Sequence, residues 1–414
     1  MKTASRSLYA AIVLIALLLN IPVSHAAQEI TLEDAISIAR AHNPDLAAAA
    51  QEINVARGEL EQANYLSQSD FESDNAANYR ARSNRSNTQD WRVGMRQEFE
   101  VFGQRSLRQK SRTVRLQQSA AEFEDGFRLL IATVRLTFLD ALRARQLVRL
   151  LTEVEALDAR LLEAARIRLS AGEIGQIDHN LAVVRYGQSQ RALIQGQEIY
   201  RLQRSSLGRL LGGYAGPEPD PTGDFNPPKL AIDLETLVAN AKSRRPDLRA
   251  RQLEVARLNA EYALNQRMNL PNPSFGVFLG HELNTERFVG GTLGLSIPLF
   301  NRRTGEATVI EARRRQASAR ERAKYLDIER EVRDAYYGYL AAYRQLQIYQ
   351  HDVVVPARES FNLLERAFKE GKIDLLRLSV AERLTFEART AYLDAGFGVW
   401  SSQIALELAT GAPL

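Results

Sequence analysis

The chain has 414 residues, a formal net charge of +4 and no cysteine. Disulfides, thiolate metal sites and lipid attachment to a cysteine are therefore excluded, so packing or oligomerisation has to stabilise the fold. Basic residues alternate with acidic ones along helical patterns, which favours solvated helix faces over the one-sided basic footprint of a nucleic-acid-binding protein.

The N-terminus predicts export from the cytoplasm. Lys2 and Arg6 precede an apolar run from Leu8 to Leu19, and the small residues Ser24 and Ala26 fit a signal-peptidase site. The run has about 12 residues, whereas a membrane-spanning helix needs about 20. We therefore expect residues 1–26 to be a cleaved signal peptide and not a membrane anchor.

Five short landmarks recur in the same order about 200 residues apart, which indicates a duplicated unit. One pair is NPDL at 43–46 and RPDL at 245–248, where a proline separates two helices whose first N-caps are expected at Thr31 and Asp233. The first structural repeat is expected at 27–213 and the second at 230–414. Residues 214–229 contain five prolines and are expected to form an extended linker between the repeats.

Each repeat contains an unusually long helical segment. Residues 104–170 contain no proline, and about 65 helical residues would span roughly 100 Å. The second segment, 304–370, is broken only by Pro356. Both segments carry apolar or small residues at the 3.5-residue spacing typical of coiled coils. These residues are Leu130, Val134, Thr137, Ala141, Ala144, Val148 and Leu151, and Val332, Ala335, Tyr339, Ala342, Leu346, Tyr349 and Val353.

Helical patterning stops between 65 and 104 and between 270 and 303, where apolar residues alternate with polar residues or glycine. This period of two predicts β-hairpins at about 69–101 and 273–299. Four strands cannot close a membrane barrel, so either several protomers pool their strands or the hairpins pack on soluble helices. The candidates for lipid-facing positions are Trp91, Val93, Met95, Leu293, Leu295 and Ile297.

The order of these features resembles the TolC-type outer membrane efflux protein family over essentially the whole mature chain. The pieces that carry the resemblance are the two PDL helix starts, the two hairpins and the two glycine turns near Gly172 and Gly371. Within the family, RQEFEVFGQR at 96–105, LPNP at 270–273 and LSIPLFNR at 295–302 resemble the heavy-metal-efflux branch.

The resemblance implies a mainly α fold with a small β part. Three protomers would pool their hairpins into a twelve-stranded outer-membrane barrel, and their coiled-coil helices would form a periplasmic α-helical tunnel. The implied function is a passive exit duct for heavy-metal cations in a tripartite efflux system of the resistance-nodulation-division type, not an enzyme. The implied partners are two further copies of the chain, a periplasmic adaptor (membrane fusion) protein, an inner-membrane pump and outer-membrane lipid. The alternatives are the same duct for drugs or protein secretion, and a periplasmic coiled-coil structural protein.

The resemblance also implies that the glycine turns at about 170–178 and 369–377 are the periplasmic tips. Asp178 and Asp374 could cap the returning helices. In a trimer they could instead form rings of carboxylates that favour cations. In the second turn Arg377 occupies the position that is usually acidic. The tip and gate candidates are Arg168, Gly172, Asp178, Gly371, Asp374 and Arg377.

No catalytic motif or cofactor-binding motif is present. The four histidines and two methionines that follow the signal peptide are dispersed along the chain, so no resident metal site is expected.

Overall fold

A computed structural model describes residues 28–78, 88–213, 218–223, 227, 229, 233–282, 286–297, 300 and 302–413. The expected signal peptide lies outside the described residues. The chain divides into two compact units. The tip unit contains the described residues of 28–43, 133–227 and 345–400, and the sheet unit contains those of 44–132, 228–344 and 401–413.

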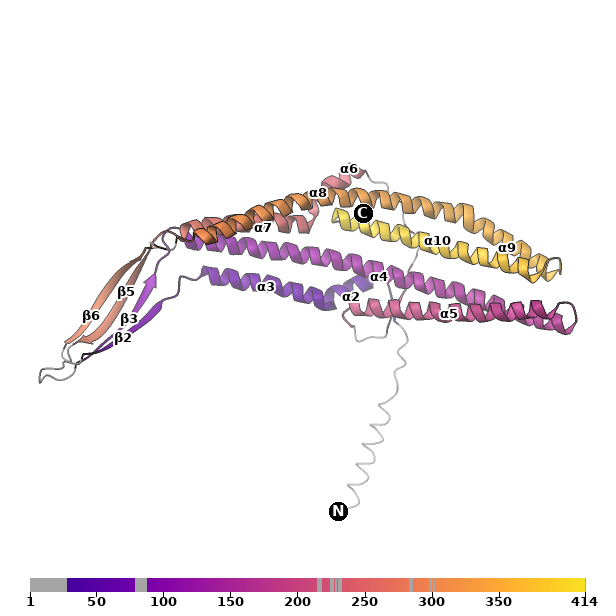
Figure 1. Ribbon diagram of the computed structural model, residues 1–414, viewed down its shortest axis with the longest axis horizontal. Helices are drawn as coiled ribbons and strands as arrows, with labels where there is room; N and C mark the ends of the chain where they lie inside the picture. The colour runs from indigo at the N-terminus through magenta and orange to yellow at the C-terminus, as the bar shows by residue number, and fades with distance from the viewer. Residues whose placement is uncertain are drawn as a thin grey trace, which may run out of the picture. The chain divides into compact units, whose positions relative to one another are not determined.

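Helices and hairpins follow the same order in both halves of the chain (Figure 1). The first half comprises β1 (Gln28–Ile30), α2 (Leu32–His42), α3 (Pro44–Asn64), β2 (Asp70–Asn78), β3 (Thr88–Glu98), α4 (Gln104–Ser170) and α5 (Gln176–Leu210). The second comprises β4 (Pro219–Pro221), α6 (Leu234–Arg244), α7 (Pro246–Arg267), β5 (Asn272–Glu282), β6 (Glu286–Ser296), α8 (Thr304–Ile348), η1 (Tyr349–Val353), α9 (Val354–Lys369) and α10 (Leu375–Thr410). The division into repeats at 27–213 and 230–414 stays an interpretation of the sequence. Among the described helices, none is both long enough and apolar enough to cross a lipid bilayer.

The predicted helix starts are confirmed. Thr31 Oγ1 accepts a hydrogen bond from the backbone N–H of Asp34 at 3.2 Å, and Asp233 Oδ2 accepts one from Thr236 at 3.0 Å. α3 and α7 each begin at the proline of the PDL motif, where a missing backbone N–H has no cost because the first helical N–H groups lack intrahelical acceptors.

The junction between α2 and α3 is held in the tip unit by buried contacts with the end of α5. Asn43 is 3 % exposed, and its Nδ2 donates to the carbonyl oxygen of Leu210 at 2.9 Å. Gly212 follows α5 with φ +81°, and a Cβ at this position would lie 2.1 Å from the carbonyl oxygen of His42. Only glycine permits this close approach of the two backbones.

The corresponding junction between α6 and α7 is held in the sheet unit by charges. Arg245 has a side chain only 3 % exposed, and it forms ion pairs with Asp247 at 2.6 Å and with Glu331. Lys324 also contacts Asp247, at 2.8 Å. The two PDL motifs therefore begin equivalent helices with different anchors, an amide in one half and an ionic network in the other.

The long helices largely follow the prediction. α4 has the predicted bounds, 104–170, and Val134, Ala141, Ala144 and Leu151 on its 3.5-residue seam are buried. In the second half the break lies before the proline, because the chain makes a π-helical turn at Tyr349–Val353 and Pro356 falls in the first turn of α9. A proline ring collides with the carbonyl four residues earlier in a regular helix, and the wider turn relieves that collision.

The proline-rich linker is partly fixed to the tip unit. Its residues Pro219–Pro221 form strand β4, which pairs in parallel with β1. Arg145 of α4 donates to the carbonyl oxygen of Pro221 at 2.8 Å, and Arg204 of α5 donates to that of Pro219 at 2.9 Å. Prolines are tolerated here because this two-stranded sheet consists only of edge strands.

The sheet unit contains one antiparallel sheet of four strands in the order β2-β3-β5-β6. The two hairpins are joined by pairing between β3 and β5, in which Val93 lies opposite Leu279. The ends of β5 and β6 pair as far as Glu282 and Glu286, and the residues between them lie outside the described part of the chain.

Candidate functional site

One face of the sheet is apolar and exposed. Directly opposed residues of antiparallel strands point to the same side, so Met95 shares a face with its neighbours Phe71 and Val277. Val289 and Leu293 on β6 are each 85 % exposed. The large apolar residues of this face are Phe71, Trp91, Val93, Met95, Phe275, Val277, Leu279, Val289, Leu293 and Leu295. An apolar surface this continuous is typical of contact with lipid or a partner.

The opposite face of the sheet carries charges and glycines. Arg92 lies 3.6 Å from Asp74, and Arg96 forms an ion pair with Glu72. Phe278 lies between two glycines of the neighbouring strands, and the guanidinium of Arg92 is 5.3 Å from its ring centre. The sheet is therefore amphipathic, as a strand system with lipid on one side and water on the other requires.

The two outer strands of the sheet are paired on one side only. Within the described chain β2 pairs with β3 and β6 pairs with β5, which leaves a row of backbone N–H and C=O groups along each outer edge. Such groups cannot stay unpaired in lipid, so this sheet would need strands from other chains at both edges if it lay in a membrane.

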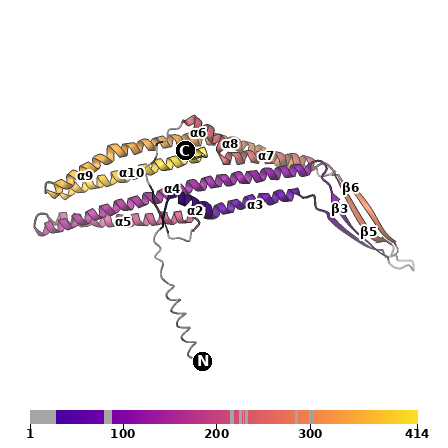
Figure 2. The same cartoon turned by 180° about the vertical axis from the view of Figure 1, so that it is seen from behind.

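The tip unit contains two helical hairpins, α4 with α5 and α9 with α10, whose members lie side by side in both views (Figures 1 and 2). Gly172 and Gly371 adopt φ of +74° and +71° at the turns. Each turn has paired hydrogen bonds, in which Gly172 donates to Leu169 and the next residue donates to Arg168. This is the glycine-dependent end expected for both helices.

Both tip aspartates cap the returning helices. Asp374 immediately precedes α10, and its Oδ1 accepts from the backbone N–H of Arg377 at 2.9 Å. Asp178 lies in the first turn of α5, and its Oδ2 accepts from the N–H of Gly175 at 3.4 Å. The capping alternative is thus satisfied within each turn, and any gating role would be additional to it.

Arg168 connects the two hairpins. Its guanidinium carbon lies 5.0 Å from the ring centre of Phe368, and Nη2 donates to the carbonyl oxygen of that residue at 3.5 Å. Arg168 also lies 3.8 Å from Glu173 in its own turn. A cation at a helix C-terminus is favourable because the carbonyl groups there carry partial negative charge.

Further from the turns, a buried charge cluster joins three helices of the tip unit. Nη2 of Arg185 on α5 lies 2.8 Å from Asp158 on α4 and also contacts Glu382 on α10. The side chains of Asp158 and Glu382 are only 5 % and 6 % exposed. Burial, with a smaller contribution from the charge of Asp158, raises the pKa of Glu382 to about 7. Two carboxylates thus share one guanidinium in a dry environment.

An apolar groove of about 550 Å³ borders this cluster between α4, α5 and α10. Leu151, Leu181 and Phe386 are among its walls. The described residues hold no group of three or more histidine and acidic side chains placed to bind a metal ion.

Comparisons with known proteins agree with this architecture. The sequence profile of the family described as outer membrane efflux protein matches residues 237–412. The cobalt-zinc-cadmium resistance protein CzcC of Cupriavidus metallidurans is 25 % identical over 374 residues, which cover 89 % of this chain and 87 % of that protein. Residues 237–412 of this chain are thus similar to the outer membrane efflux protein family.

Solved structures of similar fold include CusC, with a TM-score of 0.78 at 17 % identity over 92 % of both chains. The outer membrane protein VceC of Vibrio cholerae has a TM-score of 0.73 at 18 % identity, over 92 % of this chain and 96 % of that one. The mainly α fold with a small β part, predicted from the sequence, is confirmed.

The site residues predicted from the sequence fall into two groups. Trp91, Val93, Met95, Leu293 and Leu295 lie on the apolar face of the sheet. Ile297 follows the last residue of β6 and is exposed. The other group consists of the tip candidates, of which Arg168, Gly172 and Asp178 lie in or beside the first turn and Gly371, Asp374 and Arg377 in or beside the second.

Sequence reasoning missed the cluster of Arg185, Asp158 and Glu382. Its ion pairs join residues 27 and 197 positions apart, and each residue alone fits an ordinary charged position on a helix. One signal was available, because Asp158 is seven residues after Leu151 and so continues the apolar seam of α4 with a charge.

Proposed function

We propose that three copies of this chain form a channel in the outer membrane, and that this channel is the passive exit duct of a tripartite efflux system. The observation that carries the proposal is the amphipathic four-stranded sheet, with one apolar face and two open edges. Three sheets joined edge to edge, β6 of one protomer to β2 of the next, would close a twelve-stranded barrel. The helices would then lie in the periplasm.

The partners follow from the same proposal. A passive duct needs an energy source elsewhere, which an inner-membrane pump of the resistance-nodulation-division type and a periplasmic adaptor would supply. The similarity of residues 237–412 to the outer membrane efflux protein family supports this assembly. Heavy-metal cations are the proposed cargo, because the relative CzcC is a cobalt-zinc-cadmium resistance protein. A duct need not bind its cargo tightly, since tight binding would slow its exit.

The channel itself is tested by purification and conductance measurements. We expect the mature chain to fractionate with outer membranes, to need detergent for extraction and to run as a trimer that conducts ions in planar bilayers. Recovery as a soluble periplasmic monomer would exclude the channel and favour a coiled-coil structural protein.

The cargo is tested separately with a deletion strain. Loss of the chain should increase sensitivity to one or more of zinc, cobalt, nickel, cadmium and copper, and plasmid-borne wild type should restore tolerance. Unchanged metal tolerance together with new drug sensitivity would assign the same duct to drugs. Retention of a normally secreted protein would assign it to protein export.

The tip aspartates are predicted to act as a cation-selective constriction as well as caps. Asparagine caps a helix about as well as aspartate. Asp374→Asn should therefore keep the hydrogen bond to Arg377 and lose only the charge. We expect Asp178→Asn and Asp374→Asn to lower the cation-to-anion permeability ratio several-fold, measured from reversal potentials, with thermal stability unchanged.

Asp374→Ala is the matched control for capping. It should lower stability by about 1 kcal/mol as well as selectivity, because alanine cannot cap the helix. If both asparagine variants keep wild-type selectivity, conductance and metal tolerance, the aspartates serve only as caps.

A further inference from the structure

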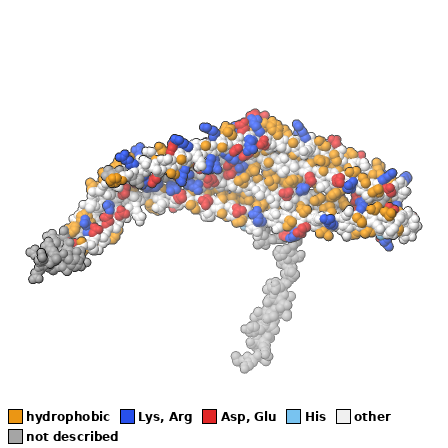
Figure 3. Space-filling model, in the orientation of Figure 1, with side chains coloured by type: hydrophobic (Ala, Val, Ile, Leu, Met, Phe, Trp, Pro, Cys, Tyr) orange, Lys and Arg blue, Asp and Glu red, His pale blue; other side chains and the backbone are white. Residues whose placement is uncertain are grey.

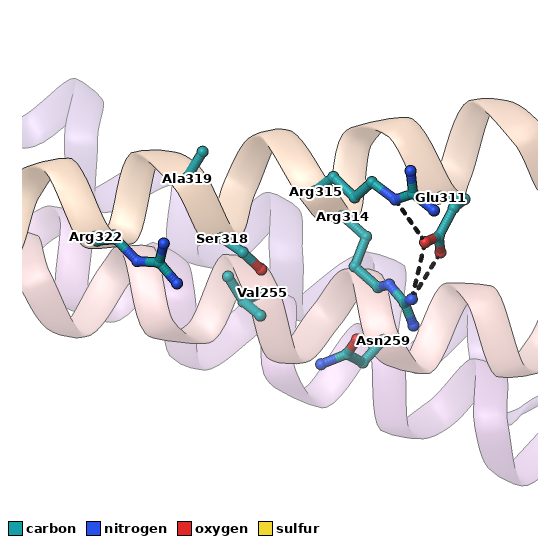
Figure 4. A pocket seen from close by; sticks show the side chains of 8 residues that line it. All are labelled: Val255, Asn259, Glu311, Arg314, Arg315, Ser318, Ala319 and Arg322. Atoms are coloured by element: carbon teal, nitrogen blue, oxygen red, sulfur yellow. Dashed lines mark hydrogen bonds and ion pairs between the residues drawn. The ribbon is translucent and has the colours of Figure 1, made fainter.

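A groove of about 500 Å³ lies between α7 and α8 in the sheet unit (Figure 4). Its polar lining includes three arginines of α8 and one glutamate, together with the hydroxyl of Ser318 and the amide of Asn259. The arginines are Arg314, Arg315 and Arg322, and the glutamate is Glu311. The groove belongs neither to the apolar face of the sheet nor to the tips.

The single carboxylate of the groove is already engaged. Glu311 lies 2.8 Å from Arg314 and 3.0 Å from Arg315. Burial acts to raise the pKa of Glu311, but the hydrogen bonds from Arg315 and Arg314 outweigh it and hold the pKa below its ordinary value. The glutamate therefore stays ionised near neutral pH and neutralises one of the three arginines, which leaves two positive charges.

Arg314 is held in place by contacts within the groove, whereas the N–H donors of Arg322 are unused. The guanidinium of Arg314 lies over the ring of Tyr262, 4.9 Å from its centre, in addition to its pair with Glu311. Arg322 has no ion pair or hydrogen bond with any described residue. Its five N–H donors, arranged as a planar fork, are therefore available to a ligand.

The surrounding surface strengthens the positive field. Residues 313–324 of α8 contain six basic residues and one acidic residue, and Lys and Arg side chains gather along α7 and α8 (Figure 3). Arg315 and Arg322 are seven residues apart, which is about two turns of helix and roughly 10 Å, so both lie on one side of α8 with Ser318 between them. The sequence alone presents these arginines as part of a solvated helix face, whereas the fold gathers three of them in one hollow.

We propose that this groove binds a phosphate-bearing ligand with two negative charges. A phosphate group matches the net charge of the hollow and the bidentate geometry that guanidinium groups prefer. The serine and asparagine provide neutral hydrogen-bond partners for its oxygens or for the attached group. The volume admits more than a bare phosphate, so the ligand is either a soluble phosphate ester or the headgroup of an anionic lipid.

The test compares two variants of α8 that differ only in the face they change. Arg322→Gln removes one charge from the groove, and Arg320→Gln removes the same charge two residues away, about 200° around the helix. Arg320 does not line the groove. Full-length protein in detergent is titrated calorimetrically with inorganic pyrophosphate, and each variant is checked by circular dichroism for wild-type helix content.

Saturable binding is expected, and Arg322→Gln should weaken it roughly tenfold or more, as loss of a charge-assisted hydrogen bond predicts. Arg320→Gln should change the dissociation constant by less than about twofold, since exposed charges at a distance are screened. A second arm measures retention of phosphatidylglycerol, against phosphatidylcholine, by protein reconstituted in nanodiscs. Pyrophosphate binding that depends on Arg322 identifies a soluble ligand, and lipid retention that depends on Arg322 identifies a headgroup.

The proposal is overturned if neither probe binds saturably, or if the two variants weaken binding equally, because then only the general charge of α8 acts. These outcomes do not depend on whether the chain conducts ions, so the proposal for the groove and the proposal for the channel can be refuted independently.

Discussion

Leu293→Arg is expected to abolish assembly of the protein in the outer membrane. Leu293 lies on the apolar face near the middle of β6 and is 85 % exposed in the protomer. An arginine that faces lipid near the middle of a transmembrane barrel costs about 2–4 kcal/mol. A trimer would carry three such residues, so the total penalty is comparable with the stability of a typical protein.

The control is Thr292→Arg, one residue away. Thr292 pairs with Gly276 on the opposite, polar face, so an arginine there would meet water and neighbouring charges. We expect the Thr292 variant to fractionate with outer membranes as trimer and the Leu293 variant to accumulate as degraded or unassembled chain, both judged by immunoblot of unheated samples. Equal behaviour of the two variants would contradict the assignment of the apolar face to lipid.

Removal of Arg185 is expected to cause the largest loss of stability in the tip unit. Arg185→Met leaves Asp158 and Glu382 buried without a cation, and breaking a buried ion pair in this way costs about 3–5 kcal/mol. The apparent midpoint of thermal unfolding, followed by circular dichroism on the purified protein, should fall clearly. Arg201→Met on the same helix removes an exposed pair with Glu198 and should change the midpoint little.

The same cluster predicts how stability depends on pH. The folded-state pKa of Glu382 is raised from 4.5 to about 7, so the folded protein binds this proton more tightly than the unfolded chain does. The stability contributed by this group is fully present below about pH 4.5 and is lost as the pH rises to about 7. The total change is about 3 kcal/mol per protomer.

Glu382→Gln isolates this contribution. The amide cannot ionise, so the variant should lose the decline in stability between about pH 4.5 and 7 and should exceed wild type in stability at neutral pH. Glu387→Gln, an exposed position on the same helix, should keep the wild-type pH profile. An unchanged profile in the Glu382 variant would mean that other groups cause the dependence.

The elements that could be predicted from the sequence are those whose causes are local. Thr31 and Asp233 cap helices through residues three positions away, and Gly172 and Gly371 end helices through their own backbone conformation. The faces of β3 and β6 follow from period-two alternation. The sequence predicts a break in the second long helix at Pro356, but the break begins earlier, at Tyr349. The π-helical turn that accommodates the proline ring precedes Pro356.

The features that could not be predicted depend on residues far apart in the chain. Glu382 forms an ion pair with Arg185, which lies 197 positions away in the sequence, and Arg245 forms one with Glu331, 86 positions away. Charged residues on helices usually face water, so their identity alone does not mark them as buried. The groove on α8 was missed for the same reason, since only the packing of α7 against it turns a charged face into a hollow.

The composition of β2 also affects which contacts the protomer can make before assembly. Its Asp70, Glu72 and Asp74 place three acidic residues on one outer strand, whereas β6 on the other edge carries one acid and one base. Arg92 and Arg96 of β3 balance only two of these carboxylates, so two protomers meeting through their β2 strands would still set an excess of negative charge against each other. In the proposed channel, a head-to-tail contact of β2 with β6 would avoid this repulsion and would leave one open edge at each end of the assembly. Subunits would therefore add until the two ends meet and close a ring.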